Sequence, residues 1–301
     1  MPELSISNAI SLLEENNFIV KFEGNISVKM MPMKLSDFEK ETDLTKKENK
    51  LAMLRREISF FQRPEKEKLL RLIIFQLFDV GYLDKSKSII DIGCWLGDNA
   101  IPWSFLISDN SVVHAIDPSD ENLNFAKNIA LINGRKNLNW VKAVCSETVG
   151  EKLNFQGSIE QANFNVSLNS EAATHISNNL DNIINSSSYK SISLIHVDVE
   201  GFEERTLRGA KKIITNERPV IVFEQHISSD KTRELIQYLV KFEYKIFMVN
   251  EILPGCEPDC RNFIAFDRRK SFPEMPKLIH SEGRRMNIFY ATLDEALIDV
   301  S

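Results

Sequence analysis

The sequence has little of what marks secreted, membrane or nucleic-acid-binding proteins. It contains only 4 cysteines in 301 residues, too few for a disulfide scaffold. The longest apolar cluster, residues 69–78, is interrupted by Arg71 and Gln76 and is too short to cross a membrane. The N-terminus lacks a basic stretch followed by an apolar core, so we expect no secretory signal. The net charge of −6 favours neither nucleic acid nor an anionic membrane as the main partner.

The composition is that of an ordinary globular protein. Hydrophobic residues make up 43% of the chain and charged residues 27%, which excludes disordered and collagen-like proteins. We therefore expect a cytoplasmic protein of enzyme size, whose oligomeric state the sequence leaves open.

The first part of the chain does not share the pattern of the rest. Residues 4–15 predict a short helix, and residues 18–22 with 26–29 predict a hairpin. The charge-rich residues 37–56 predict a solvated helix. Pro64 then favours the start of a helix that is apolar on all sides, and therefore buried, and that ends at Gly81.

From residue 88 onward, short apolar runs alternate with amphipathic stretches. The predicted strands are residues 88–92, 112–116, 139–144, 192–197, 219–223, 245–249 and 262–266. A helix capped by Ser119 and closed by Asn133-Gly134 is among the segments between them. This alternation predicts an α/β fold, a parallel sheet with helices on both faces. The last two strands lack a helix between them, so we expect that pair to be antiparallel.

These patterns divide the chain into three parts. Residues 1–85 form a helical and hairpin extension, and residues 86–267 form the α/β domain. Within that domain, residues 146–190 are a polar insertion that could contain a hairpin. Residues 268–301 form an arm that contains, in order, Pro273, Pro276, Arg284 and Arg285.

The strongest local signal follows the first strand of the α/β domain. Asp91 ends that strand, Gly93 and Gly97 lie in the turn, and Asp117 stands about twenty residues further on. Glycines allow a ligand close to the backbone, and an acid at the end of the second strand can accept both hydroxyls of a ribose. Any α/β protein can place a glycine after a strand, but the spacing as a whole predicts a nucleoside site. Trp95 occupies the third position of the turn, which breaks the dinucleotide fingerprint G-x-G-x-x-G, and no P-loop ending is present. The pattern D-x-G-x-x-x-G instead indicates S-adenosylmethionine.

Two more strands end in polar side chains at the same rim. Strand alternation places Asp198 and Glu200 on one side of the fourth core strand, and it places Glu224 and His226 on one side of the fifth. A strand-end acid can also cap a helix, and a lone histidine is usually packed or solvated. Because all four share the rim of the nucleoside site, we interpret them as catalytic and His226 as a general base.

The cysteine pair Cys256 and Cys260 could be half of a metal site or a redox pair. Cys94 and Cys145 are far away in the sequence, and no second pair of ligands lies nearby. We interpret the two residues as free thiols in a loop.

Several elements, taken together, are those of a known family. They are Asp91-Ile92-Gly93, Asp117-Pro118, Asn179-Leu180-Asp181, Asp198-Val199-Glu200-Gly201-Phe202-Glu203, Gly209-Ala210 and residues 219–224. In this set the chain resembles the FkbM family of class I S-adenosylmethionine-dependent methyltransferases, over roughly residues 88–266. The Asp-Val-Glu-Gly element is the most specific part. The family usually has asparagine in place of Trp95 and glutamate in place of Asp117.

The resemblance implies a fold, a donor site and an activity. The fold would be a Rossmann-like, seven-stranded, mostly parallel sheet with an antiparallel last strand. The implied cofactor-binding residues are Asp91, Gly93, Cys94 and Gly97 in the turn, Asp117 at the ribose, and Ser146 with Cys145 beside the adenine. The activity would be methyl transfer to a hydroxyl oxygen, commonly on a sugar or polyketide, so the partner would be a small-molecule or glycan acceptor.

Within this scheme His226 would be the base, oriented by Glu224 or Glu200, while Asp198 would meet the donor's ammonium group or the acceptor. A divalent metal on Asp198, Glu200 and His226 is an alternative, but mixed carboxylate and imidazole ligands suit Mg or Mn only partly. We therefore expect no metal. Two other classes of protein remain open: a nicotinamide-dependent oxidoreductase on a Rossmann-like fold, and a non-catalytic interaction module.

Overall fold

Helices and strands alternate through most of the chain in a computed structural model that describes residues 5–157, 162–166, 175–185, 191–253, 256–273, 281–282, 287–288 and 296–301. The helices are α1 (Ile6–Glu15), α2 (Ser36–Glu39), α3 (Leu44–Gln62), α4 (Lys68–Asp79), α5 (Ala100–Ser104), α6 (Asp120–Ile132), α7 (Leu180–Asn185), α8 (Glu203–Arg208), α9 (Lys211–Glu217) and α10 (Asp230–Lys241), with 3-10 turns η1 (Glu23–Asn25) and η2 (Arg63–Glu65). The strands are β1 (Ile19–Lys21), β2 (Ser27–Lys29), β3 (Ser88–Ile92), β4 (Val113–Asp117), β5 (Leu138–Lys142), β6 (Val144–Cys145), β7 (Lys152–Gly157), β8 (Ala162–Val166), β9 (His175–Asn178), β10 (Ile192–Val197), β11 (Val220–His226), β12 (Tyr244–Val249), β13 (Cys260–Asp267), β14 (Ser281–Glu282), β15 (Asn287–Ile288) and β16 (Leu297–Asp299).

The main sheet has the order β16-β12-β13-β11-β10-β3-β4-β5. Strands β5, β4, β3, β10 and β11 are parallel, and β13 lies antiparallel between β11 and β12. The predicted α/β fold and the antiparallel pairing of the last two core strands are therefore confirmed. Beyond the seven expected strands, β16 from the C-terminal arm adds an eighth at the edge, antiparallel to β12.

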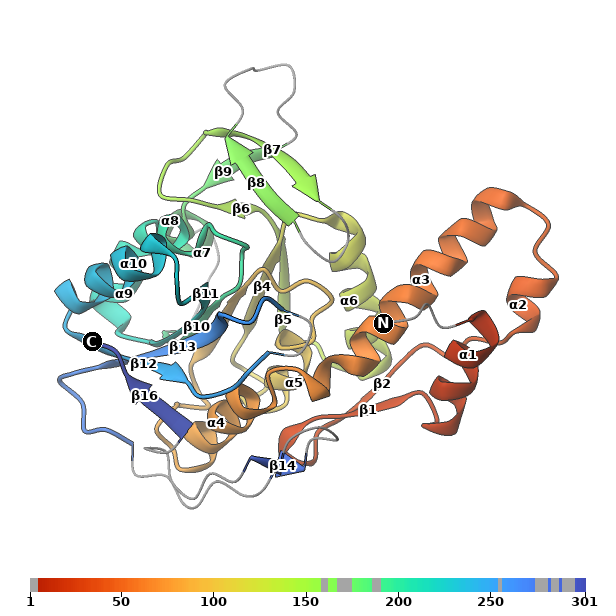
Figure 1. Ribbon diagram of the computed structural model, residues 1–301, viewed down its shortest axis with the longest axis horizontal. Coiled ribbons are helices and arrows are strands. Elements are labelled where there is room, and N and C mark those ends of the chain that lie inside the picture. The colour runs from red at the N-terminus through yellow and green to blue at the C-terminus, as the bar shows by residue number, and fades with distance from the viewer. Residues whose placement is uncertain are drawn as a thin grey trace.

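Both faces of this sheet are covered by helices, which explains why the central strands are buried throughout and mostly apolar. Every residue of β3, β4 and β10 is buried, as expected for a parallel sheet between two helical layers. One core contains residues of α4, α5 and α6, and the opposite core contains residues of α7 to α10. Figure 1 shows α8, α9 and α10 on the side of the sheet away from α1, α2 and α3. No helix in the described part of the chain is both long and apolar enough to cross a bilayer.

The N-terminal extension packs against α5 and α6, and it corrects two predictions. The hairpin β1–β2 is present as expected. The segment expected as a solvated helix over residues 37–56 is largely exposed, but it forms two helices, the short α2 and the long α3. Only the last part of α3 turns one side to the core, where Arg56, Glu57 and Phe60 are among the buried residues. This side of α3 packs on a core shared with α1, β1, β2 and α6. Long polar side chains can be buried in a helix when their charged ends find partners, as the guanidinium of Arg56 does at Glu121. Pro64 lies in η2 rather than in a helix, and α4 begins only at Lys68, after Glu67 in a left-handed conformation.

The polar insertion contains the expected hairpin, formed by β7 and β8. Its last part is not an insertion in structural terms, because α7 contributes Leu180 and Ile184 to the core. The predicted strand 139–144 is two strands, since β5 stays in the main sheet while β6 pairs with β9. Pro276, Arg284 and Arg285 of the C-terminal arm lie outside the described residues.

Candidate active site

One face of the sheet carries the polar residues at the carboxyl ends of its strands. In the sheet register Asp91 pairs with His196 and His196 pairs with Val222. Because paired residues share a face and alternate residues return to it, Glu224 lies on that face too. Asn262, the partner of Glu224 on β13, completes the row. This is the face covered by α4, so the N-terminal extension forms one wall of the candidate site.

The turn after β3 is held by hydrogen bonds within the chain. Gly93 has φ +76°, and its N–H and that of Cys94 both donate to the carbonyl oxygen of Ile116, at 2.9 and 3.1 Å. A Cβ built on Gly93 would overlap the backbone carbonyl of Asp198 and lie 2.7 Å from its carbonyl carbon. Glycine is therefore required at position 93 first of all because β3 and β10 approach each other there.

The second glycine and the unusual Trp95 have separate roles in that turn. Gly97 also has a positive φ, and a Cβ there would lie 3.1 Å from the Cβ of Ala126 on α6. Trp95 adopts φ +44°, rare for a bulky residue, and its ring lies under the guanidinium of Arg63 at 5.4 Å. The residue that departs from the family pattern thus joins the turn to the N-terminal extension.

Asp117 fixes the same turn from the end of β4. Its Oδ2 accepts a hydrogen bond from the N–H of Trp95 at 3.0 Å, and its Oδ1 accepts one from the N–H of Ser119 at 2.8 Å. Burial raises the pKa of Asp117 to about 7. Each carboxylate oxygen can accept a second bond, so these contacts leave room for the predicted ribose bonds.

A narrow hollow of about 10 Å³, room for little more than one water molecule, lies beside this turn. Its lining is mostly apolar and consists of Ile92, Gly93, Ile116, Pro118, Ala143, Val144, Cys145, Val199 and Phe202. That volume is far below the roughly 300–1,000 Å³ typical of pockets that bury a whole ligand. The apolar lining matches the faces of a base in character, but the walls would have to move apart to admit one.

Two predicted cofactor-binding residues do not reach this hollow. The thiol of Cys94 lies in the hydrophobic core beside Trp103, and burial raises its pKa. Ser146 is fully buried, and its hydroxyl donates to Glu151 at 3.4 Å. Of the predicted adenine-side pair, Cys145 lines the hollow and Ser146 does not; the assignment of Ser146 and Cys94 to the cofactor stays a prediction.

The buried pair of Asp91 and His196 was missed by the sequence reasoning, which gave His196 no role. Their side chains meet at 2.7 Å, and the imidazole packs edge-on against Trp103. Asp91 Oδ2 and His196 Nε2 are buried and make no hydrogen bond with any described residue. Strand periodicity places His196, two residues before Asp198, on the same face as Asp198, but only the sheet register brings it against Asp91.

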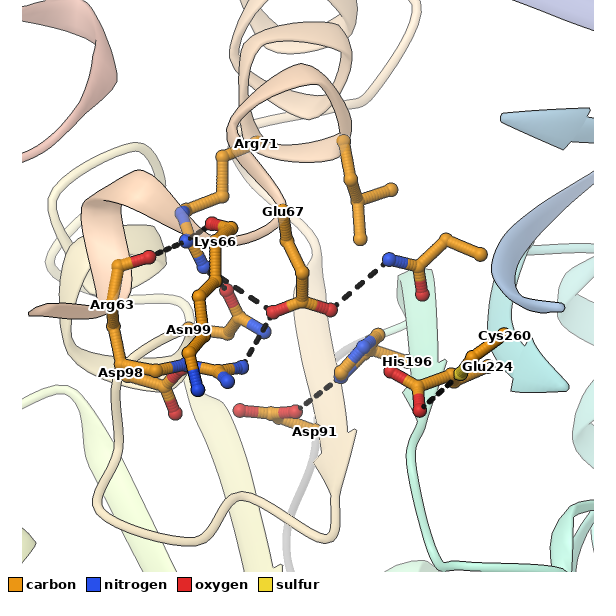
Figure 2. A network of polar contacts seen from close by, with 12 residues as sticks. Arg63, Lys66, Glu67, Arg71, Asp91, Asp98, Asn99, His196, Glu224 and Cys260 are labelled. Atoms are coloured by element: carbon orange, nitrogen blue, oxygen red, sulfur yellow. Dashed lines mark hydrogen bonds and ion pairs between the residues drawn. The ribbon is translucent and has the colours of Figure 1, made fainter. Parts of the chain in front are cut away.

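Charged residues of the N-terminal extension close over this pair (Figure 2). The carboxylate of Glu67, only 2% exposed as a residue, accepts hydrogen bonds from Arg63 at 2.5 Å and from Asn262 at 3.0 Å. Arg63 also pairs with Asp98, which follows the glycine turn. Residues far apart in the sequence thus meet above β3 and β10, which no local pattern could indicate.

The Asp-Val-Glu-Gly-Phe-Glu element folds around its last residue. The carboxylate of Glu203 accepts the N–H groups of Val199 and Gly201, at 3.1 and 3.0 Å. Glu200 lies beyond the end of β10 with φ +51°, so the strand alternation used to place it beside Asp198 does not apply. Glu203 is the residue that shapes this loop and so positions Asp198.

His226 ends β11 on the exposed rim. Its Nδ1 lies 2.9 Å from Asp259 Oδ1, and this contact raises the pKa of His226. The acid that orients the imidazole is therefore Asp259 rather than Glu224 or Glu200. The other imidazole nitrogen makes no hydrogen bond that the structure records within the described residues.

Carboxylates crowd the part of the rim nearest Asp198. Burial, followed by the carboxylates of Glu224 and Glu67, raises the pKa of Asp198. Burial and Glu67 likewise raise the pKa of Glu224 to about 8. The metal alternative on Asp198, Glu200 and His226 is not supported, because these three are not among the described side chains whose ligand atoms converge.

A Rossmann-like sheet in this strand order, with a glycine turn after β3 and acids at the carboxyl ends of its strands, is the arrangement that the sequence resemblance implies. Residues 102–246 match the model of the methyltransferase FkbM domain. The chain therefore carries an FkbM methyltransferase domain and is an S-adenosylmethionine-dependent methyltransferase. The match is narrower than the expected similarity over residues 88–266, and it contains Asp117, Asp198, Glu224 and His226 but not the glycine turn.

Known structures show distant likeness. The methyltransferase FkbM from Methylobacillus flagellatus is 16% identical, with 75% of this chain and 56% of that chain covered at a TM-score of 0.43. Precorrin-6y C5,15-methyltransferase from Geobacter metallireducens is 13% identical, with 65% of this chain and 87% of that chain covered at a TM-score of 0.41. A putative methyltransferase from Streptococcus mutans, solved in complex with SAH, is 15% identical, with 64% of this chain and 96% of that chain covered at a TM-score of 0.40. No curated protein matches the chain. Because these TM-scores lie below 0.5, the family model carries the assignment.

The residues present fit the methyl donor. The hollow beside Gly93 has the apolar lining that an adenine ring requires, and Asp117 stands at the end of β4. The unpartnered Asp91 Oδ2 is a buried acceptor on the side of the turn where the donor's ammonium group would be recognised. When bound, S-adenosylmethionine supplies a methyl group on a sulfonium centre.

Replacing Asp117 by alanine is expected to weaken donor binding by about 1.5–3 kcal/mol, the range for hydrogen bonds to a charged group. The weaker binding should reflect two losses: the hydrogen bonds predicted to the ribose, and the bond from the Trp95 N–H that holds the turn in place. Calorimetry with S-adenosylhomocysteine measures it. Asp120→Ala is the matched control, since that carboxylate is exposed on α6 and pairs with Lys142. Equal affinities of the two folded variants would contradict the assignment.

Proposed function

We propose that this methyltransferase acts on a hydroxyl oxygen of a neutral small molecule or glycan, such as a sugar or a polyketide-like acceptor. The observation that carries the proposal is the His226–Asp259 pair on the exposed rim. A hydroxyl is a weak nucleophile, and a group that takes its proton contributes about 10²–10⁴-fold to such reactions. An exposed imidazole held through one nitrogen can offer the other to an acceptor that arrives from solvent.

The remaining residues of the rim would orient the two reactants. Transfer needs the acceptor oxygen in line with the methyl group, and positioning of this kind can contribute roughly 7–11 kcal/mol. Glu203 fixes the loop that carries Asp198, and Glu67 with Arg63 covers the site from the extension. These contacts support a site in which the protein holds the acceptor rather than activating it covalently.

Charge at the rim supports a neutral acceptor. Beyond the effect of burial, Glu224 and Glu67 raise the pKa of Asp198, and Glu67 and Glu200 raise that of Glu224. A second anion brought by the acceptor would add to this repulsion. Hydroxyl-rich, uncharged molecules avoid that cost, in keeping with the net charge of −6.

The two other classes considered from the sequence do not account for the chain. The FkbM methyltransferase domain over residues 102–246 identifies the donor as S-adenosylmethionine, not a nicotinamide. The same match makes the chain an enzyme and not a non-catalytic module.

The test is to incubate the enzyme with donor labelled in its methyl group and with matched acceptors. We expect label in an alkali-stable methyl ether when a neutral polyol or sugar is supplied, and none with the analogue in which the reactive hydroxyl is replaced by hydrogen. Mass spectrometry of the product locates the methyl group. Label recovered on an amine, or in an alkali-labile methyl ester, would overturn the hydroxyl assignment.

A further inference from the structure

Two cysteines and a glutamate meet at the end of β11 and β13. In the antiparallel register of these strands His226 pairs with Cys260 and Glu224 with Asn262. The buried thiol of Cys260 donates to Glu224 Oε1 at 2.9 Å, as Figure 2 shows. The loop before β13 returns Cys256, which is exposed, to within hydrogen-bonding reach of Cys260.

The three ligand atoms form a compact group. The two sulfur atoms and the Glu224 oxygen all lie within 4.8 Å of one another, the only such group in the part of the chain that the structure describes. Ligands of a tetrahedral zinc ion lie about 2.0–2.3 Å from the metal, so atoms this close need only small rotations to surround one. The sequence reasoning found no further ligand near the cysteine pair; the β11–β13 register supplies Glu224 from more than thirty residues away.

Acidic groups also gather at this site. Glu224 is mostly buried, and the carboxylates of Glu67 and Glu200 lie close enough to act on it electrostatically. No ion pair to Glu224 is recorded among the described residues. A metal ion bound by these residues would displace the thiol protons and take the two cysteines as thiolate ligands.

We propose that Glu224, Cys256 and Cys260 bind one zinc-class divalent ion, with water as the fourth ligand on the exposed side of Cys256. Two thiolates select zinc over magnesium or calcium, which prefer all-oxygen ligands. Three protein ligands and one open position are the pattern of zinc sites that remain accessible to small molecules. The proposal is independent of the proposed acceptor, since binding is measured without donor or acceptor.

The experiment uses the full chain, reduced and freed of metal with a chelator, and titrates it with Zn²⁺ alone. We expect one equivalent to bind, and binding to fall at least about 10-fold in Cys256→Ser, Cys260→Ser and Glu224→Gln. Glu257→Gln, a carboxylate change in the same loop, is the control and should bind as wild type. Substitution with Co²⁺ should give a thiolate charge-transfer band that both cysteine variants weaken.

Cys256→Ser keeps the test decisive, because an exposed side chain can be replaced without disturbing the core that contains Cys260. Thermal melts by circular dichroism confirm that each variant is folded. Wild type that binds Zn²⁺ no more tightly than folded Cys256→Ser would overturn the proposal. So would a Cys256–Cys260 disulfide in protein purified with zinc present and without added oxidant.

Discussion

Gly93→Ala is expected to destabilise the fold by about 3 kcal/mol or more and to abolish donor binding. Two costs add: a non-glycine residue at φ +76° loses about 1–2 kcal/mol, and forcing a methyl group into a filled space costs about 1–3 kcal/mol more. The space is filled by the backbone carbonyl of Asp198, which cannot move away without separating β3 from β10. Gly93→Val should be worse still. Denaturant unfolding and calorimetry with S-adenosylhomocysteine measure the two effects.

Gly134→Ala is the matched control for this prediction. Gly134 also has a positive φ, of +65°, but a Cβ there would have no atom within 4 Å. Its substitution should therefore cost only the conformational part, about 1–2 kcal/mol. If Gly93→Ala were as mild as Gly134→Ala, the close approach of β3 and Asp198 would not be what requires glycine.

His226→Ala is expected to lower methyl transfer by about 10²-fold or more while donor affinity stays within about threefold. The reason is that His226 lies on the exposed rim, away from the hollow beside Gly93, and acts on the acceptor. Single-turnover transfer rates and donor calorimetry separate the two quantities. Stability should not change, since the side chain is exposed.

Asp259→Asn tests the orienting contact of the same imidazole. It keeps the shape of the side chain but removes the carboxylate that accepts from Nδ1, so we expect a smaller loss of rate than in His226→Ala. Arg233→Ala, at an exposed ion pair on α10, should leave transfer unchanged. Wild-type rates in His226→Ala would show that transfer depends on positioning alone or on Asp198.

Local chemistry was sufficient to predict most of the fold. The strands β3, β4 and β10 are fully buried and mostly apolar, and Ser119 caps α6 by accepting from the Asn122 N–H at 3.2 Å, as the sequence indicates. Errors arose where tertiary packing overrides a local pattern. The charged segment over residues 37–56 is largely exposed as expected, but it breaks between α2 and α3, and the end of α3 beyond it packs against α6 and buries Glu57 and Phe60.

The candidate site was less accessible to sequence reasoning, because its contacts join distant segments. The pairing of Asp91 with His196 and the approach of Glu224 to Cys260 both follow from sheet register, which no single strand specifies. Glu67 reaches Asn262 across almost two hundred residues. Glu200 was misplaced because the alternation of side chains along β10 was extended past Val197, where the strand ends, into a loop in which Glu200 has a positive φ.

The most direct test of the account is calorimetric titration of the purified chain with S-adenosylhomocysteine and, separately, with NADH. The account predicts one saturable site for S-adenosylhomocysteine, displaced by S-adenosylmethionine, weakened by Asp117→Ala and lost in Gly93→Ala, with no binding of NADH. A folded wild-type chain that binds no S-adenosylhomocysteine, or that binds it equally well after Asp117→Ala and Gly93→Ala, would contradict the assignment of the donor site.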